Sequence, residues 1–305
     1  MRPNGKRSTA AATGRLTMSA CAALVALAAA ASAQSAHTPP LSIVTHENAA
    51  EPGAFTLNFS ELGIVARSNI TSTTYELSVD PGHGTARFVS YHQHVDPLVL
   101  PGGLSTGDIT VEIVEGSSSG SFDALTGTFT TSEMYAVHFT GDLSAFGLTS
   151  PVLLPSSSAG ELTVDAVTGG VVTMDWNGSG ELSNPFDPSS PLTFTYRCAV
   201  NTLFPATPAN MVGLTLTPDV QSLQLPKEIE HSLVGLLDQS LAQVQLGNRS
   251  RAVQSLRAFS RKVEYLSGGL IGEADAARLI TSASETIDLI GRDRFSPVGG
   301  THHHK

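Results

Sequence analysis

The sequence has few cysteines, one tryptophan and no long apolar run. The two cysteines among its 305 residues are Cys21 and Cys198. Cys21 lies in a segment that we expect to be removed, so an intrachain disulfide is excluded and the fold must depend on its core. Cys198 stands in the strand-like run 192–200, and we interpret it as a buried, unreactive thiol.

Aromatic side chains that could form a platform for sugars are also scarce. Trp176 is the single tryptophan, and it shares its predicted strand face with an apolar neighbour. Tyr91 and Tyr135 have apolar neighbours as well. We therefore predict that all three side chains are buried in a core.

The first 33 residues match a secretory signal peptide. Four basic residues come first, Arg2, Lys6, Arg7 and Arg15. An apolar stretch follows at about 18–30, and Ala31-Ser32-Ala33 supplies small residues at the cleavage position. The stretch is shorter than the roughly 20 residues that span a bilayer. We predict cleavage before Gln34, a secreted or periplasmic bacterial protein, and no transmembrane anchor after cleavage.

Basic residues are nearly absent from residues 34–225. That segment contains three, Arg67, Arg87 and Arg197, and no lysine, against eighteen acidic residues. An acidic surface repels phosphate groups, so we exclude nucleic acid as a partner. From residue 226 onward the charges nearly balance, with ten basic and nine acidic residues.

Residues 41–200 follow a short leader at 34–40 and are rich in threonine, valine, serine and glycine, with turn-forming clusters throughout. This pattern predicts an antiparallel all-β domain that forms either a sandwich or a barrel. Asp80, Asp123 and Asp165 are each followed four residues later by glycine. Aspartate can bond to the backbone two residues on, and glycine accepts a left-handed conformation, so we expect three hairpin turns.

Alternation along residues 87–96 collects polar side chains on one face of a strand. One face carries Val89, Tyr91 and Val95, and the other carries Ser90, His92, His94 and Asp96. Histidines two residues apart point the same way and can share an ion, and His83 in the preceding turn could add a ligand. His92, His94, Asp96 and His83 are therefore a candidate site for a divalent transition metal. The alternative is two solvated histidines on an outer face, with no cofactor. No catalytic residue is assigned.

Helical periodicity begins at Pro226. We predict one helix to about Leu246, a second that ends at Gly268-Gly269, and a third that ends at Gly291. Each carries one apolar stripe, so the three should pack together. The preceding segment 201–225 contains three prolines and is interpreted as a linker with one short strand at Val212–Leu216. The tail 292–305 is expected to be disordered.

The helical region resembles the FIMAH domain, a small module found at the C-terminus of secreted bacterial proteins. The matching residues are Leu246-Gly-Asn248, Ala252, Leu256-Arg-Ala-Phe259, Val263, Ile271, Asp275-Ala276, Leu279-Ile280, Ala283 and Ile287. The resemblance covers residues 226–291, and Ser260 and Gly272 depart from its pattern. It implies an accessory module with no assigned chemistry.

These observations predict a secreted, non-catalytic protein with a β-rich interaction or cell-envelope module and an accessory helical domain. Its partner would be an extracellular or envelope protein, or a glycan. The alternative is a secreted metal-dependent hydrolase, or a metal-binding protein, that uses the His92/His94 face. An enzyme predicts that these side chains meet in a concave pocket, whereas a binding module predicts them on a convex sheet face.

Overall fold

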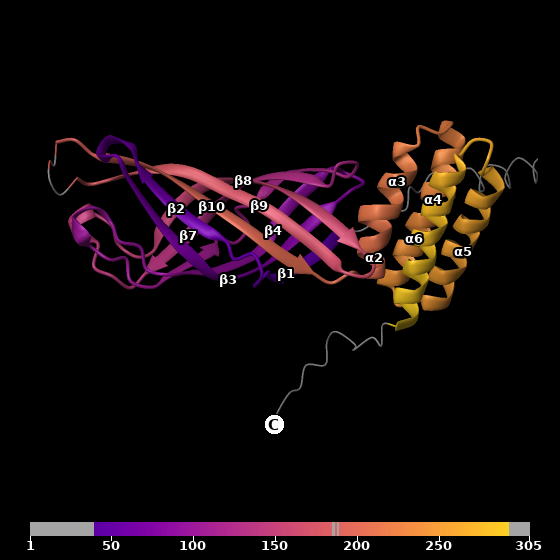
Figure 1. Ribbon diagram of the computed structural model, residues 1–305, viewed down its shortest axis with the longest axis horizontal. Coiled ribbons are helices and arrows are strands. Elements are labelled where there is room, and N and C mark those ends of the chain that lie inside the picture. Colours follow the sequence, from indigo (N-terminus) through magenta and orange to yellow (C-terminus); the bar gives the residue numbers. More distant parts are fainter. Residues whose placement is uncertain (1–39, 185–186, 188, 293–305) are drawn as a thin grey trace, which may run out of the picture. The chain divides into compact units, whose positions relative to one another are not determined.

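The computed structural model describes residues 40–184, 187 and 189–292 (Figure 1). The predicted signal peptide, the leader up to residue 39 and the tail after Arg292 lie outside the described residues. The described chain is an antiparallel sheet followed by helices, so the predicted fold class is confirmed.

Ten strands form one sheet within the described residues. Their bounds are β1 Leu41–Glu47, β2 Ala54–Phe59, β3 Ile64–Asp80, β4 Thr85–Val95, β5 Ile109–Ile113, β6 Ser119–Asp123, β7 Thr128–Phe139, β8 Val152–Asp165, β9 Gly169–Leu182 and β10 Leu192–Phe204. Three short 3-10 turns interrupt the connections, η1 at Ser60–Leu62, η2 at Pro101–Gly103 and η3 at Ser144–Phe146.

The sheet closes on itself because β3 pairs with both β1 and β4. Both β1 and β2 pair with β3 on one side and with β10 on the other. β2 does so at one end of the ring and β1 at the other end. Between β4 and β7, β5 and β6 share the ring in the same way. Within the part of the chain that the structure describes, closure leaves no long unpaired strand edge. Of the two predicted alternatives, the closed ring is the barrel.

The three predicted Asp–Gly turns are confirmed, and they close the β3–β4, β6–β7 and β8–β9 hairpins. The Asp123 carboxylate accepts a hydrogen bond from the backbone N–H of Leu125 at 2.9 Å, and Asp165 accepts from Val167 at 2.8 Å. Asp80 accepts instead from the backbone N–H of His83, three residues on, at 3.0 Å. Gly84, Gly127 and Gly169 all have positive φ. The repeated spacing in the sequence therefore marks three Asp–Gly hairpin turns, two of which share the same aspartate bond.

Aromatic side chains fill the inside of the ring. Trp176, Tyr91 and Tyr135 are all buried, as predicted. The ring centroids of Tyr135 and Trp176 lie 4.7 Å apart, and the indole N–H of Trp176 donates to the Tyr91 hydroxyl at 3.0 Å. Cys198 is also buried, as predicted, and burial raises the pKa of its thiol.

One residue of the predicted core face lies outside. Val89 is 45% exposed, although Tyr91 and Val95 of the same predicted face are buried. The pairing of β3 with β4 shifts by one residue between Glu76 and Leu77, so that Val89 has no partner. Such a bulge reverses the alternation locally, and strict alternation therefore predicted the wrong side for Val89.

The helical region contains the three predicted helices, α4 Lys227–Gln245, α5 Arg249–Leu266 and α6 Glu273–Arg292. α5 packs against both α4 and α6. Their facing sides bury the apolar stripes, including Leu237, Phe259 and Leu279. Gly247, between α4 and α5, has positive φ, as expected of a glycine that ends a helix.

The segment predicted as a linker is largely helical. β10 extends to Phe204, and α2 Pro208–Met211, η4 Val212–Leu216 and α3 Thr217–Ser222 follow. The strand predicted at Val212–Leu216 is wrong, because η4 is a π-helical turn. Thr207 caps this helical segment by accepting from the Asn210 N–H, and Pro208 occupies its first turn, where no N–H is needed. The prolines of this segment therefore mark the start of a helical segment, and the prediction of a linker is wrong.

Candidate functional site

Two features of the closed sheet could hold a ligand. One is the histidine pair on the outer face of β4, and the other is an apolar cavity at the end of the ring where β2 and β5 lie. They lie on opposite faces of the sheet, because His92 and His94 alternate with the buried Tyr91, Gln93 and Val95.

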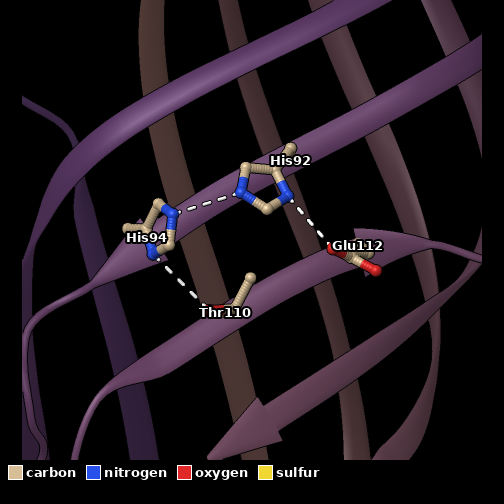
Figure 2. Close-up of polar contacts among 4 residues, drawn as sticks. All are labelled: His92, His94, Thr110 and Glu112. Carbon is tan, nitrogen blue, oxygen red and sulfur yellow. Dashed lines mark hydrogen bonds and ion pairs between the residues drawn. The ribbon is translucent and has the colours of Figure 1, made fainter.

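The two histidines point toward each other across the outer face (Figure 2). The Nε2 atom of His92 lies 3.1 Å from the Nε2 atom of His94. The Nδ1 atom of His92 lies 3.2 Å from Oε1 of Glu112, and the Nδ1 atom of His94 lies 3.5 Å from Oγ1 of Thr110. The side chains of His92 and Glu112 are 47% and 50% exposed, so the group stands in solvent.

Strand register assembles this group from two strands. β5 pairs with β4 so that Glu112 lies opposite His92 and Thr110 lies opposite His94. β7 pairs with β5 so that His138 lies opposite Thr110. His138 therefore lies in the same cross-strand row as His94, roughly 10 Å away at two strand spacings. Glu112, Thr110 and His138 had no signal in the sequence, because their proximity depends on register alone.

The other two predicted ligands, His83 and Asp96, take no part in the hydrogen bonds that hold this group. His83 lies in the β3–β4 turn, where its Nδ1 atom is 2.7 Å from Oδ2 of Asp80. Nine residues along an extended strand separate it from His92 by roughly 25–30 Å. Asp96 follows the end of β4 and is exposed, and its backbone N–H donates to Asn69. Within the described residues, no group of three or more histidine, cysteine or acidic side chains is arranged to hold a metal ion.

The cavity has a volume of about 200 Å³ and an almost wholly apolar wall. Its lining comes from six strands and from the loops that follow β4 and β7. Three buried phenylalanines line it, Phe55 and Phe59 from β2 and Phe194 from β10. Val137 and Val152, both partly buried, lie directly opposite each other on β7 and β8 and line it as well.

Few polar groups reach this cavity. Thr106, Ser179 and Glu181 contribute to its lining, although Ser179 and Glu181 are exposed positions of β9, and none of the described lining residues is basic. An engineered apolar cavity of about 150 Å³ stays dry and binds benzene, so this volume suits a ligand of one ring or a short alkyl chain. Sequence reasoning missed the cavity, because its lining residues look like ordinary core positions.

A carboxyl group lies inside the ring, away from both features. Glu133 on β7 is 5% exposed and accepts a hydrogen bond from the Ser158 hydroxyl. Burial raises its pKa, and the hydrogen bond from Ser158 opposes part of that effect. Among described side chains, Oε2 of Glu133 and the hydroxyls of Thr131 and Tyr135 are buried without a hydrogen-bond partner. Glu133 therefore lies neither at a turn nor on the outer face of the sheet.

Comparison with models of known protein families and with curated proteins gave no match. None of the described helices is both long and apolar enough to cross a membrane. A function for this chain therefore has to be inferred from the geometry of the histidine pair and the cavity.

Proposed function

We propose that the chain is an exported, non-catalytic binding protein whose closed sheet takes up a small, neutral, apolar molecule. The observation that carries this proposal is the cavity of about 200 Å³, lined almost entirely by apolar side chains. Concave, mostly apolar cavities with few polar groups are the common form of small-molecule sites, and the mouth of a barrel is a frequent place for them. Export is proposed from the signal-peptide pattern of residues 1–33.

Binding is better supported than hydrolysis at the predicted site. His92 and His94 lie on the outer, convex face of the ring, His83 is engaged with Asp80 in the β3–β4 turn, and among the described residues no group of three or more histidine, cysteine or acidic side chains could hold a metal ion. Glu133 is a buried acid that accepts its hydrogen bond from a serine hydroxyl. The helices α4 to α6 would then serve as a FIMAH-type accessory module that keeps the protein at an extracellular or envelope partner.

Straight-chain alcohols test this proposal. Binding of 1-butanol through 1-decanol should strengthen about fourfold per added methylene, because each buried methylene contributes about 0.8 kcal/mol, and the gain should stop when the cavity is full. Alkanoates of equal length should bind more weakly, because the almost wholly apolar wall disfavours burial of their carboxylate. Calorimetry measures the affinities. Trp176 emission gives a second signal, because Phe55 lines the cavity and its ring centroid lies 5.6 Å from that of Trp176.

A matched pair of variants locates the site. Val152→Phe fills the cavity and should weaken octanol binding at least tenfold, whereas Val44→Phe, on an exposed position of β1, should leave it unchanged. Near-ultraviolet circular dichroism checks that both variants fold. The proposal fails if no alcohol binds saturably, or if both variants bind octanol equally well.

A further inference from the structure

The outer face of the sheet carries a second site that is independent of the apolar cavity. We propose that His92 and His94 together bind one divalent transition-metal ion, with Cu²⁺ the tightest, and that Glu112 and Thr110 orient the two imidazoles. Four positions of two paired strands make up the site (Figure 2).

The spacing of the two imidazole nitrogens fits one shared ion. Metal–nitrogen bonds of about 2.0–2.1 Å at angles between square and tetrahedral place two adjacent nitrogens about 2.9–3.4 Å apart. The Nε2 atoms of His92 and His94 are 3.1 Å apart. Both side chains are exposed, so an ion reaches them from solvent and water completes its coordination.

The remaining ring nitrogens already have outer partners. Metal-binding histidines commonly donate their second ring N–H to a carboxylate or another oxygen, which fixes the ring and its tautomer. Nδ1 of His92 faces Oε1 of Glu112 at 3.2 Å, and Nδ1 of His94 faces Oγ1 of Thr110 at 3.5 Å. Each imidazole therefore presents Nε2 to the ion and Nδ1 to an oxygen of β5.

The protons balance without an added acid or base. In the free protein, Thr110 can donate to Nδ1 of His94, whose Nε2–H then donates to Nε2 of His92, whose Nδ1–H donates to Glu112. When the ion binds, the proton on Nε2 of His94 moves to Nδ1 and is donated to Thr110. The ion replaces the shared hydrogen between the two Nε2 atoms, and no net proton is released.

The surroundings favour a cation. The residues paired with the two histidines on either side are Ser72, Thr74, Thr110 and Glu112, and none is basic. Residues 34–225 carry eighteen acidic residues against three basic ones, and such a surface attracts cations. Imidazole ligands suit copper, nickel and zinc, and affinity for such sites rises toward Cu²⁺. Ca²⁺ and Mg²⁺ require oxygen ligands and should not compete.

Copper titration of the full chain tests the site. His302, His303 and His304 are first replaced by serine, because three adjacent histidines also bind copper. One equivalent of Cu²⁺ should then bind, and the electron paramagnetic resonance spectrum should show coupling to two imidazole nitrogens. His92→Ala or His94→Ala should each weaken binding about a hundredfold, because the ion then has one imidazole and not two. Glu112→Gln should weaken it about tenfold through the loss of the orienting carboxylate.

Two histidines outside the site serve as controls. His46→Ala removes an exposed strand histidine from β1, and His83→Ala removes the turn histidine. Both should change the affinity less than twofold. The proposal is overturned if the His92→Ala, His94→Ala double variant still binds one equivalent, if the spectrum shows one nitrogen, or if excess Ca²⁺ displaces the copper. Such a result leaves the apolar-ligand proposal standing, because alcohol binding depends on other residues.

Discussion

At Glu133 the sheet holds a carboxyl group on its inner face, where its neighbours include Tyr135. A buried carboxylate is costly unless it is paired, and the group accepts a hydrogen bond from the Ser158 hydroxyl rather than from a basic side chain. Its raised pKa follows from this burial. Burial of this carboxylate therefore lowers the free energy of unfolding at neutral pH, and a neutral substitution at Glu133 should have a measurable effect on stability.

We predict that Glu133→Gln stabilises the protein at pH 7 but not at pH 4. The folded chain keeps the Glu133 proton to a higher pH than the unfolded chain, whose glutamates titrate near their usual pKa of about 4.3. Stability is therefore full below that pH and is lost as pH rises toward the folded pKa. Glutamine stays neutral throughout and avoids this loss. Differential scanning calorimetry should find Tm raised by about 2–4 °C at pH 7, which corresponds to about 1 kcal/mol.

Glu161→Gln is the matched control for this prediction. Glu161 lies on β8 with its side chain exposed, so its loss should change stability by less than about 0.5 kcal/mol at either pH. A Tm difference between Glu133→Gln and the parent that stays constant from pH 4 to pH 7 would contradict the role assigned to burial.

At the scale of elements, the turns and loops between strands depend on glycines whose surroundings differ. Gly127 has φ of 70°, and a Cβ there would meet the carbonyl oxygen of Leu162 on β8. Gly116 has φ of 74°, and a Cβ there would meet nothing within 4 Å. Comparing alanine substitutions at these two glycines separates the energetic cost of a left-handed backbone from the cost of a steric clash between the new Cβ and a neighbouring atom.

We predict that Gly116→Ala lowers the free energy of unfolding by about 1–2 kcal/mol, the usual cost of a left-handed alanine. Gly127→Ala should lower it by at least about 1 kcal/mol more, because the β7–β8 pairing must also move. Urea denaturation measures both values. Equal losses in the two variants would show that the close approach to Leu162 contributes nothing.

Two elements show how local rules are overruled. The bulge at Val89 exposes a valine because one extra residue on β4 must be accommodated between fixed partners on β3. Val212–Leu216 is helical despite its valine, threonine and glycine, because Val212, Leu216 and Val220 are buried together on one helical side. In both places tertiary packing outweighs local preference.

At the scale of the whole molecule, closure of the ring is the central feature of the β region. The β3–β4 pair completes it, and its ladder runs from Ile70 opposite Val95 to Asp80 opposite Thr85. Without this pair, β3 and β4 would each have an unpaired edge whose backbone amides are exposed to solvent. With it, their amides should be as well protected as those of the sheet centre.

We predict that hydrogen exchange is slow across residues 72–80 and 85–95, with protection about a thousandfold or more, as for β9 and β10. Core elements exchange through opening free energies that approach the global stability of at least about 5 kcal/mol. Mass spectrometry of deuterated peptides measures this. If the backbone amides of residues 85–95 exchange as fast as those of the loop at 97–108, the ring is not closed.

The sequence alone determined the antiparallel β class, the three Asp–Gly turns, the burial of Trp176 and Cys198, and the three helices α4 to α6. These features follow from alternation, helical periodicity and turn chemistry, which act between residues close in the chain. His92 and His94 as a pair were predicted for the same reason, since they are two residues apart on one strand.

Only the tertiary structure decided that the sheet closes, that Glu112 and Thr110 lie beside the histidines, and that an apolar cavity lies at one end. Register between strands sets each of these, and register depends on bulges and on packing across the whole ring. Glu112 is twenty residues from its partner His92. No local pattern carries that information, because a shift of one residue would turn the same side chain to the other face.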